Sequence, residues 1–178
     1  MKTLVFFIFS MFFVLQSCNN DDDNNFQNPI DQLPPETQAG ENTFGCLLDG
    51  EPFLPSGGIN PLDCQYQFVD SEYYFRLQGN KQDENFNLLG LFLHTNALEI
   101  IECETYQLLL EADENATGIF GFNGDLFFTN SNQTGQMTIT HLDLTNQTVS
   151  GTFFFDVIDQ NGELRQIREG RFDMQFTL

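Results

Sequence analysis

Short runs in which apolar and polar residues alternate, separated by turn-forming residues, are the feature that most constrains this fold. At the C-terminus, Phe172, Met174, Phe176 and Leu178 alternate with polar residues over 171–178. Successive side chains of a β-strand point to opposite faces of its sheet. The pattern therefore predicts a strand with one buried face and one face in water, which is typical of antiparallel sheets.

The same alternation predicts further strands along the chain. Phe153, Phe155 and Val157 share one face of a predicted strand over 151–157. After it, Asn161-Gly162 predicts a hairpin turn, because this pair readily adopts the positive φ angles of a two-residue turn. The other predicted strands cover residues 43–48, 73–78, 86–94, 118–122, 125–129, 136–144 and 164–169.

Several local features depart from plain alternation. In 136–144 the apolar positions change parity after Ile139, which predicts a β-bulge near His141. Residues 108–114 have the composition of one short helix. Turns are predicted at Asp49-Gly50, Gly79-Asn80 and Asn123-Gly124.

About eight to ten short strands with close turns predict an all-β domain, an antiparallel meander that forms a β-sandwich or a partly closed barrel. The spacing of the strands does not choose between these two forms. Residues 42–178 are numerous enough to bury one core and fold as a single domain.

The first 17 residues have the pattern of a lipoprotein signal peptide. Lys2 precedes an apolar stretch over residues 4–15, which is shorter than the roughly 20 residues of a membrane-spanning helix. Leu15-Gln16-Ser17-Cys18 then resembles the lipobox at which bacterial lipoproteins are cleaved and acylated on cysteine. The sequence predicts a lipid anchor on Cys18; the alternatives are an ordinary secretory signal cleaved nearby and an uncleaved anchor.

Residues 18–41 read CNNDDDNNFQNPIDQLPPETQAGE and are polar, acidic and proline-containing. This composition predicts a disordered tether. The Asn and Asp residues directly after Cys18 resemble the acidic tract that Bacteroidota lipoproteins use as a surface-export signal, although a plain solvated spacer has the same composition. We therefore expect a lipid-anchored protein of the outer membrane, displayed on the cell surface or, alternatively, facing the periplasm.

Charge narrows the range of partners. The chain has 26 Asp and Glu against 6 Lys and Arg, a formal net charge of −20. Binding to nucleic acid requires clustered basic residues, so this class of partner is not expected. Attraction to an anionic bilayer is not expected either. We expect a monomer that is held to a membrane through acyl chains on Cys18, with a ligand that the sequence does not identify.

Three cysteines follow Cys18, and an odd number permits at most one intramolecular disulfide. Cys46 and Cys64 flank a segment rich in Pro and Gly. A bridge between them is predicted, and closing a loop of this length stabilises a fold by about 3 kcal/mol in the chain-entropy model. Cys103 shares parity with Ile101 and is predicted to be a buried thiol on a strand.

Sequence motifs for catalysis are absent. The chain has no HExxH, GxSxG, P-loop or dinucleotide-binding fingerprint, and no CxxC pair that would indicate a zinc site. His94 and His141 lie at the end and at the bulge of predicted strands, where a structural role is the better interpretation. No catalytic, cofactor-binding or metal-binding residue is therefore predicted.

Four segments carry a resemblance to a known family. They are LPPETQ (33–38), NTFGCLLDG (42–50), VSGTFFFD (149–156) and IREGRFD (167–173). Together they resemble a family of uncharacterised Bacteroidota lipoproteins described only as a domain of unknown function. The resemblance spans most of the mature chain but consists of strand and turn signatures. It implies export and a β fold, and it implies no catalytic residue.

The sequence thus favours a membrane-anchored, surface-displayed lipoprotein whose non-catalytic β domain binds a ligand or has a structural role. One alternative is a surface glycan hydrolase, which would need two carboxylates facing each other across a cleft. The other is a carrier of small hydrophobic ligands, suggested by the 21 Phe residues, which would need a hollow core.

Overall fold

The computed structural model of the chain describes residues 28–58 and 60–178. The predicted signal peptide, Cys18 and the first ten residues of the predicted tether lie outside this part. It contains one short 3₁₀ helix and eleven strands: η1 (Pro29–Gln32), β1 (Thr43–Leu48), β2 (Glu51–Phe53), β3 (Leu62–Val69), β4 (Glu72–Gln82), β5 (Leu88–Asn96), β6 (Thr105–Leu108), β7 (Asn115–Phe122), β8 (Asp125–Phe128), β9 (Gly135–Asp143), β10 (Thr148–Ile158) and β11 (Leu164–Gln175).

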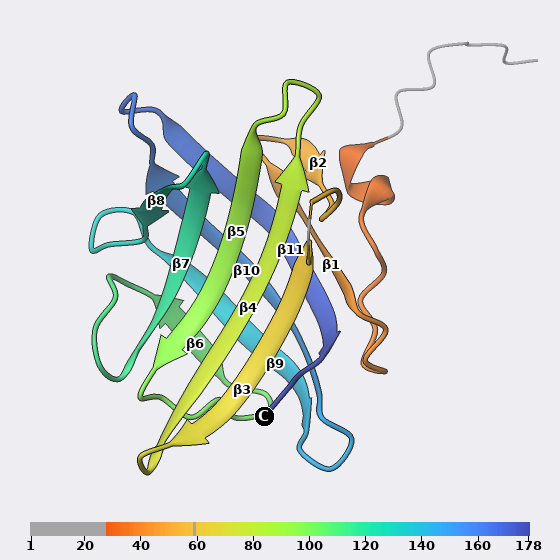
Figure 1. Cartoon of the computed structure of the whole chain (residues 1–178). Helices are drawn as coiled ribbons and strands as arrows, with labels where there is room; N and C mark the ends of the chain where they lie inside the picture. The colour runs from red at the N-terminus through yellow and green to blue at the C-terminus, as the bar shows by residue number, and fades with distance from the viewer. Residues whose placement is uncertain (1–27, 59) are drawn as a thin grey trace, which may run out of the picture.

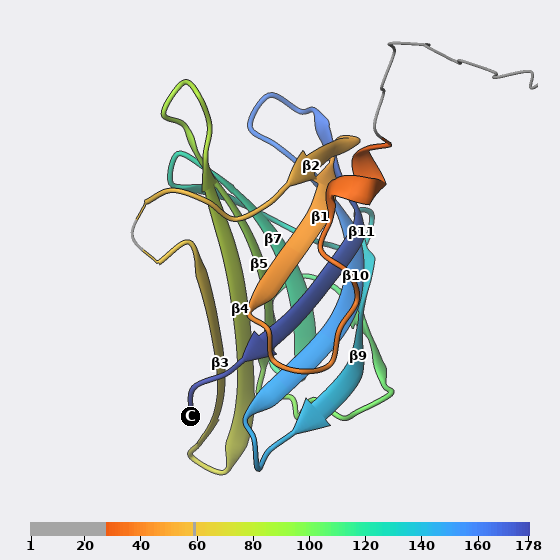
Figure 2. The same cartoon turned by 90° about the vertical axis from the view of Figure 1, so that its right-hand side faces the viewer.

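All eleven strands belong to one sheet with the order β2-β1-β11-β10-β9-β6-β7-β5-β4-β3, and β8 pairs with β7. The sheet curls so that β3, β4, β5 and β7 form a front layer over a back layer of β1, β11, β10 and β9 (Figures 1 and 2). The pairs of neighbouring strands are antiparallel except β6 and β7, which run parallel where Leu108 meets Ala116. The all-β, mostly antiparallel fold class is thereby confirmed.

The chain just beyond β11 meets β3, the strand at one end of the sheet. Just beyond β11, the backbone N–H of Thr177 donates to the carbonyl of Cys64 (3.0 Å), and the N–H of Tyr66 donates to the carbonyl of Thr177 (2.9 Å). No ladder joins β3 to β1 or β2 among residues 28–58 and 60–178. The sheet therefore curls back on itself at this place without closing into a barrel.

Aromatic side chains fill the space between the two layers. The ring centroid of Phe153 lies 5.2 Å from that of Phe44 and 6.4 Å from that of Phe172. Phe155 and Val157 are fully buried on the same face of β10 as Phe153, as the alternation predicted. Burying an aromatic or branched aliphatic side chain contributes about 1.5–3 kcal/mol, so these rings supply much of the stability of the fold.

Several local predictions are confirmed. Ser150 pairs with His141 but Gly151 pairs with Ile139, so one extra residue of β9 forms the predicted bulge. At the turn between β7 and β8, Asn123 and Gly124 have φ angles of 51° and 98°. Positive φ at both central residues is the geometry that Asn-Gly favours in hairpins.

Other local predictions are wrong. Gly79-Asn80 lies inside β4 rather than in a turn. A Cβ on Gly79 would lie 2.9 Å from the ring of Phe44, so glycine is needed here for close packing. Residues 108–114 form the end of β6 and a loop, and no helix. Strands β2, β3 and β6 were not predicted.

Residues 28–41, which we call the strap, are packed against the domain, so the predicted disorder over 18–41 is wrong for this part. The strap runs along the outside of the back layer before the chain enters β1 (Figure 2). Leu33 is buried, and the side-chain amide of Gln38 donates to the carbonyl of Thr140 in β9 (3.1 Å).

Asp173 of β11 holds the strap in place. It lies on the face of β11 that was predicted to be wet, yet it is only 1% exposed, because the strap covers it. Gly40 has a φ of 69°, and a Cβ there would lie 2.6 Å from Thr148, so only glycine fits this approach. The carboxylate of Asp173 accepts hydrogen bonds from the Thr37 hydroxyl (2.7 Å), the backbone N–H groups of Ala39 (3.0 Å), Gly40 (2.8 Å) and Glu41 (3.2 Å), and the Ser150 hydroxyl (2.8 Å).

The predicted Cys46–Cys64 disulfide is not formed. Both are buried free thiols, and burial raises the pKa of each. Cys46 pairs with Phe53 of β2 and Cys64 pairs with Leu77 of β4, so the two cysteines stand on strands that are not neighbours. Cys103 is exposed, with a φ of 67° in the turn before β6, so its prediction as a buried strand thiol is also wrong.

Candidate ligand-binding groove

A row of polar residues crosses the outer face of the front layer. Strand register places Gln65 opposite Arg76, Arg76 opposite His94, and His94 opposite Thr117. Residues directly opposite each other project from the same face of a sheet and are close enough to interact. The four residues therefore form a continuous row across β3, β4, β5 and β7.

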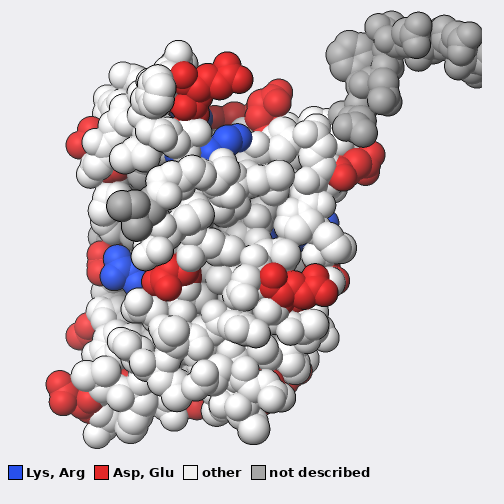
Figure 3. Space-filling view, turned by 45° about the vertical axis from the view of Figure 1, so that its right-hand side comes forward, with Lys and Arg blue, Asp and Glu red and all other residues white. Residues whose placement is uncertain are grey.

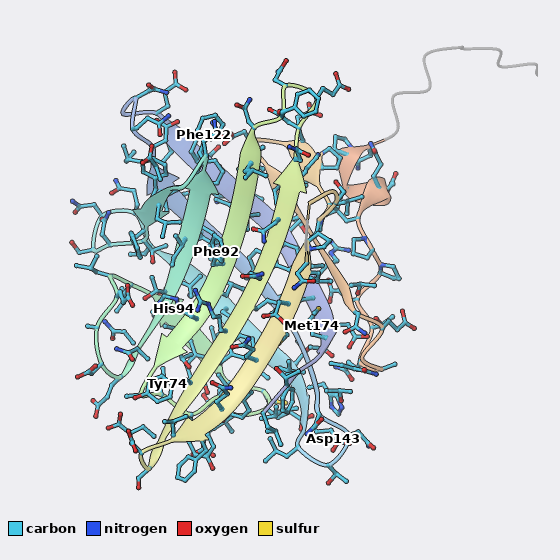
Figure 4. The ribbon with its side chains drawn as sticks, viewed as in Figure 1. Tyr74, Phe92, His94, Phe122, Asp143 and Met174 are labelled. Atoms are coloured by element: carbon cyan, nitrogen blue, oxygen red, sulfur yellow. The ribbon has the colours of Figure 1, made fainter. Side chains whose placement is uncertain are left out.

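Three residues of this row, Gln65, Arg76 and His94, line a hollow of about 410 Å³. Most of the residues that line it have polar side chains, and Figure 4 shows Tyr74 and His94 on two of the strands that form it. The polar side chains that line it include those of Gln65, Gln67, Tyr74, Arg76, His94 and Glu111.

A second hollow of about 210 Å³ continues the first, because Arg76, His94 and Glu111 line both. The rest of its lining is apolar. It consists of Phe92, Ile119, Leu126 and Phe128, from β5, β7 and β8. We refer to the two hollows together as the groove; it has a polar half and an apolar half.

Glu111 reaches the groove from the loop between β6 and β7. This loop is fixed at both ends by backbone hydrogen bonds, from Leu109 to the carbonyl of Ala116 (2.8 Å) and from Glu114 to the carbonyl of Asn96 (2.8 Å). Thr129 adds a third attachment, since its hydroxyl donates to the carbonyl of Leu109 (2.7 Å). The loop thereby forms a fixed wall over the outer face of β5.

Two buried polar atoms lie side by side in the row without a hydrogen-bond partner. They are Nε2 of His94 and Oγ1 of Thr117. Oε1 of Glu111 lies 3.7 Å from the His94 nitrogen, which is too far for a hydrogen bond. Buried polar atoms are nearly always satisfied in folded proteins. Because His94 also lines both hollows, its nitrogen marks a place for a polar group from outside the chain, water or ligand.

The charges of the groove nearly cancel. Burial lowers the pKa of His94; Glu111 acts in the opposite direction, and Arg76 adds to the lowering. His94 is therefore neutral near pH 7, which leaves one cation and one anion. The three arginines of β11, Arg165, Arg168 and Arg171, pair with carboxylates, whereas Arg76 forms no ion pair within the described chain.

Sequence reasoning did not find this groove. His94 was expected at the end of a strand, but it lies inside β5 and lines both hollows. His141 stands at the predicted bulge, 3.4 Å from Glu102, and lines neither hollow. The available signal was the alternation in 62–69, where Gln65 and Gln67 lie on the face opposite to Cys64 and Tyr66.

Glu111 is the only carboxylate among the residues that line the groove, whereas hydrolysis of glycans ordinarily uses two. Elsewhere, hydrogen bonds from Asn87 and from Asn146 lower the pKa of Asp83 and Asp143, respectively. A general acid needs the opposite shift. The described residues also contain no group of three or more His, Cys, Asp or Glu able to hold a metal ion.

No protein-family model, curated protein or solved structure matches the chain. The resemblance to an uncharacterised family of Bacteroidota lipoproteins therefore stays a prediction. Within residues 28–58 and 60–178, no helix has both the length and the hydrophobicity to cross a membrane.

Proposed function

We propose that this chain is an exported lipoprotein, anchored through acyl chains on Cys18 and displayed on the outer-membrane surface, whose β domain binds a ligand without catalysis. The groove carries the binding part of this proposal. It combines an Arg76 without an ion pair and a buried His94 nitrogen without a hydrogen-bond partner. Unsatisfied groups of this kind in a hollow are what a binding site offers before its ligand arrives.

Binding is favoured over hydrolysis because the groove offers one carboxylate. A two-carboxylate mechanism places a second Asp or Glu about 5–10 Å from the first across the scissile bond. Glu111 has no such partner among the lining residues. The groove can orient a ligand, but it lacks the pair that would cleave a glycosidic bond.

Binding on the outer face is also favoured over carriage in a lumen. The interior is occupied by packed rings, such as Phe75 and Phe172 with centroids 6.2 Å apart. A carrier would need those rings to leave a cavity. Eight phenylalanines of the described residues are thus buried in the core, whereas Phe68, Phe86 and Phe154 are exposed.

The anchor and the surface location are tested by shaving intact cells with protease, beside a strain with Cys18→Ala. We expect the wild-type protein to be digested on whole cells and the variant to leave the membrane fraction. A wild-type protein that stays membrane-bound but protected would place the domain in the periplasm. A variant that stays membrane-bound would refute the lipid anchor.

The groove is tested without knowledge of the natural ligand by screening a library of small polar fragments with two-dimensional amide NMR. We expect the hits to shift resonances around Arg76 and His94 and to lose this effect in Arg76→Ala. Arg171→Ala removes the same charge from β11 and is the matched control. Hits that gather elsewhere on the surface would show that the groove is not the binding site.

A further inference from the structure

We infer that the ligand of the groove is a neutral oligosaccharide. This inference rests on the proposed binding function and adds the chemical class of the ligand. Four observations support it: the hydrogen-bonding groups of the polar half, the Phe92 ring in the apolar half, the net charge of the domain, and the pairing of the β5 backbone with both neighbouring strands.

The polar half offers both donors and acceptors. Gln65 and Gln67 each present an amide that can donate and accept, Arg76 donates only, and the carboxylate of Glu111 accepts only. A sugar hydroxyl both donates and accepts, so adjacent hydroxyls can use all of these groups at once. A simple anion or cation would use only one of the two sets.

The apolar half is built around Phe92, which Figure 4 shows on β5 above His94. A Cβ at Gly90 would lie 2.7 Å from the ring of Phe92, and a Cβ at Gly121 would lie 3.3 Å from it. The ring therefore rests on two glycines of adjacent strands, which fixes its position. Leu126 beside it is 49% exposed. A rigid, partly exposed ring next to polar groups suits a molecule with an apolar face and a hydroxyl edge, as a pyranose ring has.

The charge of the domain disfavours an acidic ligand. The chain has a formal net charge of −20, and the summed field of such a protein repels polyanions. Figure 3 shows several separate groups of acidic side chains on one face and few basic ones. Within the groove, Arg76 and Glu111 offset each other, so no local excess of positive charge would attract an acidic glycan.

An extended peptide also combines polar and apolar groups, but the groove offers it no strand to pair with. The residues of β5 at the groove pair with β4 on one side and with β7 on the other. Recognition of extended peptides by strand addition requires free backbone groups at a sheet edge. The groove lies on a side-chain face, where only side chains contact the ligand.

The test uses soluble Cys18→Ala protein and calorimetric titration with neutral oligosaccharides that cover the common α- and β-linked glucans, mannans and xylans. A polygalacturonate oligomer and a pool of uncharged peptides form two further arms. We expect at least one neutral oligosaccharide to bind, and Phe92→Ala and Arg76→Ala each to weaken binding by about tenfold or more. The matched controls, Phe154→Ala on β10 and Arg171→Ala on β11, should change the affinity by less than roughly twofold.

Each of the other outcomes would refute one part of the proposal: the ligand class, the groove or the absence of catalysis. Preference for the acidic oligomer or the peptides, with the same sensitivity to Phe92→Ala, would refute the ligand class and keep the groove. No binding by any neutral oligosaccharide would also refute the class, while fragment hits in the groove would still support a binding site. Glycan binding that both groove variants retain would refute the groove. Chromatography of the titrated sugars adds one check, since shortened products would refute the absence of catalysis.

Discussion

Replacing Asp173 with asparagine tests how the strap is held. The carboxylate is buried and accepts hydrogen bonds from three backbone N–H groups of the strap and from two hydroxyls. Asparagine has nearly the same shape, but one of its two terminal atoms donates. In the variant, an NH₂ group would therefore face N–H donors, and at least two of the hydrogen bonds would be lost.

The size of the effect follows from the pKa of Asp173. Burial acts to raise this pKa, but the hydrogen bonds outweigh it and lower the pKa from 3.8 to about 2. A shift of this size corresponds to about 2 kcal/mol of stability near pH 7. Because the variant also leaves buried donors without acceptors, we expect Asp173→Asn to lower the free energy of unfolding by about 2–4 kcal/mol.

The pH dependence gives a sharper measurement. The folded-state pKa is below the unfolded value, so the contribution is complete above about pH 4 and is lost as the pH falls toward about 2. In urea unfolding followed by circular dichroism, the gap between wild type and Asp173→Asn should be largest at about pH 7, clearly smaller at about pH 3 and smallest at about pH 2.

Asp143→Asn is the control. Its pKa is also lowered, first by the backbone hydrogen bond from Asn146, but Asp143 lies at the end of β9 beside a surface turn and should matter much less. An equal loss of stability in the two variants would refute our account of Asp173. So would a gap between wild type and Asp173→Asn that does not change with pH.

Three further predictions concern the core and the groove. A thiol reagent should modify Cys103 in the folded protein and reach Cys46 and Cys64 only on unfolding; a disulfide-linked pair of peptides in mass spectrometry would contradict this. Because burial lowers the pKa of His94, its NMR titration in the folded protein should have a midpoint below about 6.5. As the pH falls, His94 should therefore be protonated in the unfolded chain before it is protonated in the folded one. The free energy of unfolding should therefore fall as the pH falls below that value, and a midpoint above it would refute the burial argument. Gly135→Ala places a Cβ against the backbone of β10, so urea unfolding should show a loss of about 1–3 kcal/mol; an unchanged stability would mean that this part of β10 can move.

The strands that sequence patterns predict well are those in which burial differs between alternate residues. Phe153 and Phe155 in β10 and Phe172 and Met174 in β11 are buried as the alternation predicted. The period of two is a local property, so no knowledge of the rest of the chain is needed to detect it. The bulge at His141 was also local, because it appeared as a change of parity.

The features that were missed depend on pairing between distant segments. Gln65, Arg76, His94 and Thr117 form a row only because β3, β4, β5 and β7 are in that register, which the sequence does not state. By alternation, Asp173 falls on the solvent-facing side of β11. It is buried because the strap, more than a hundred residues earlier in the chain, covers it. Composition alone made that segment look like a linker.

The strap also determines how the domain responds to mechanical load. Tension applied from the N-terminal side enters the fold through residues 28–41 and, once the contacts of the buried Leu33 are loaded, stretches the hydrogen bonds to Asp173. Asp173 is on β11, which has strand neighbours on both sides, β1 and β10. The pull is thus spread over the middle of the back layer instead of peeling an edge strand one hydrogen bond at a time. The hydrogen bonds that hold the strap against Asp173 thereby also distribute an applied force over several strands of the sheet.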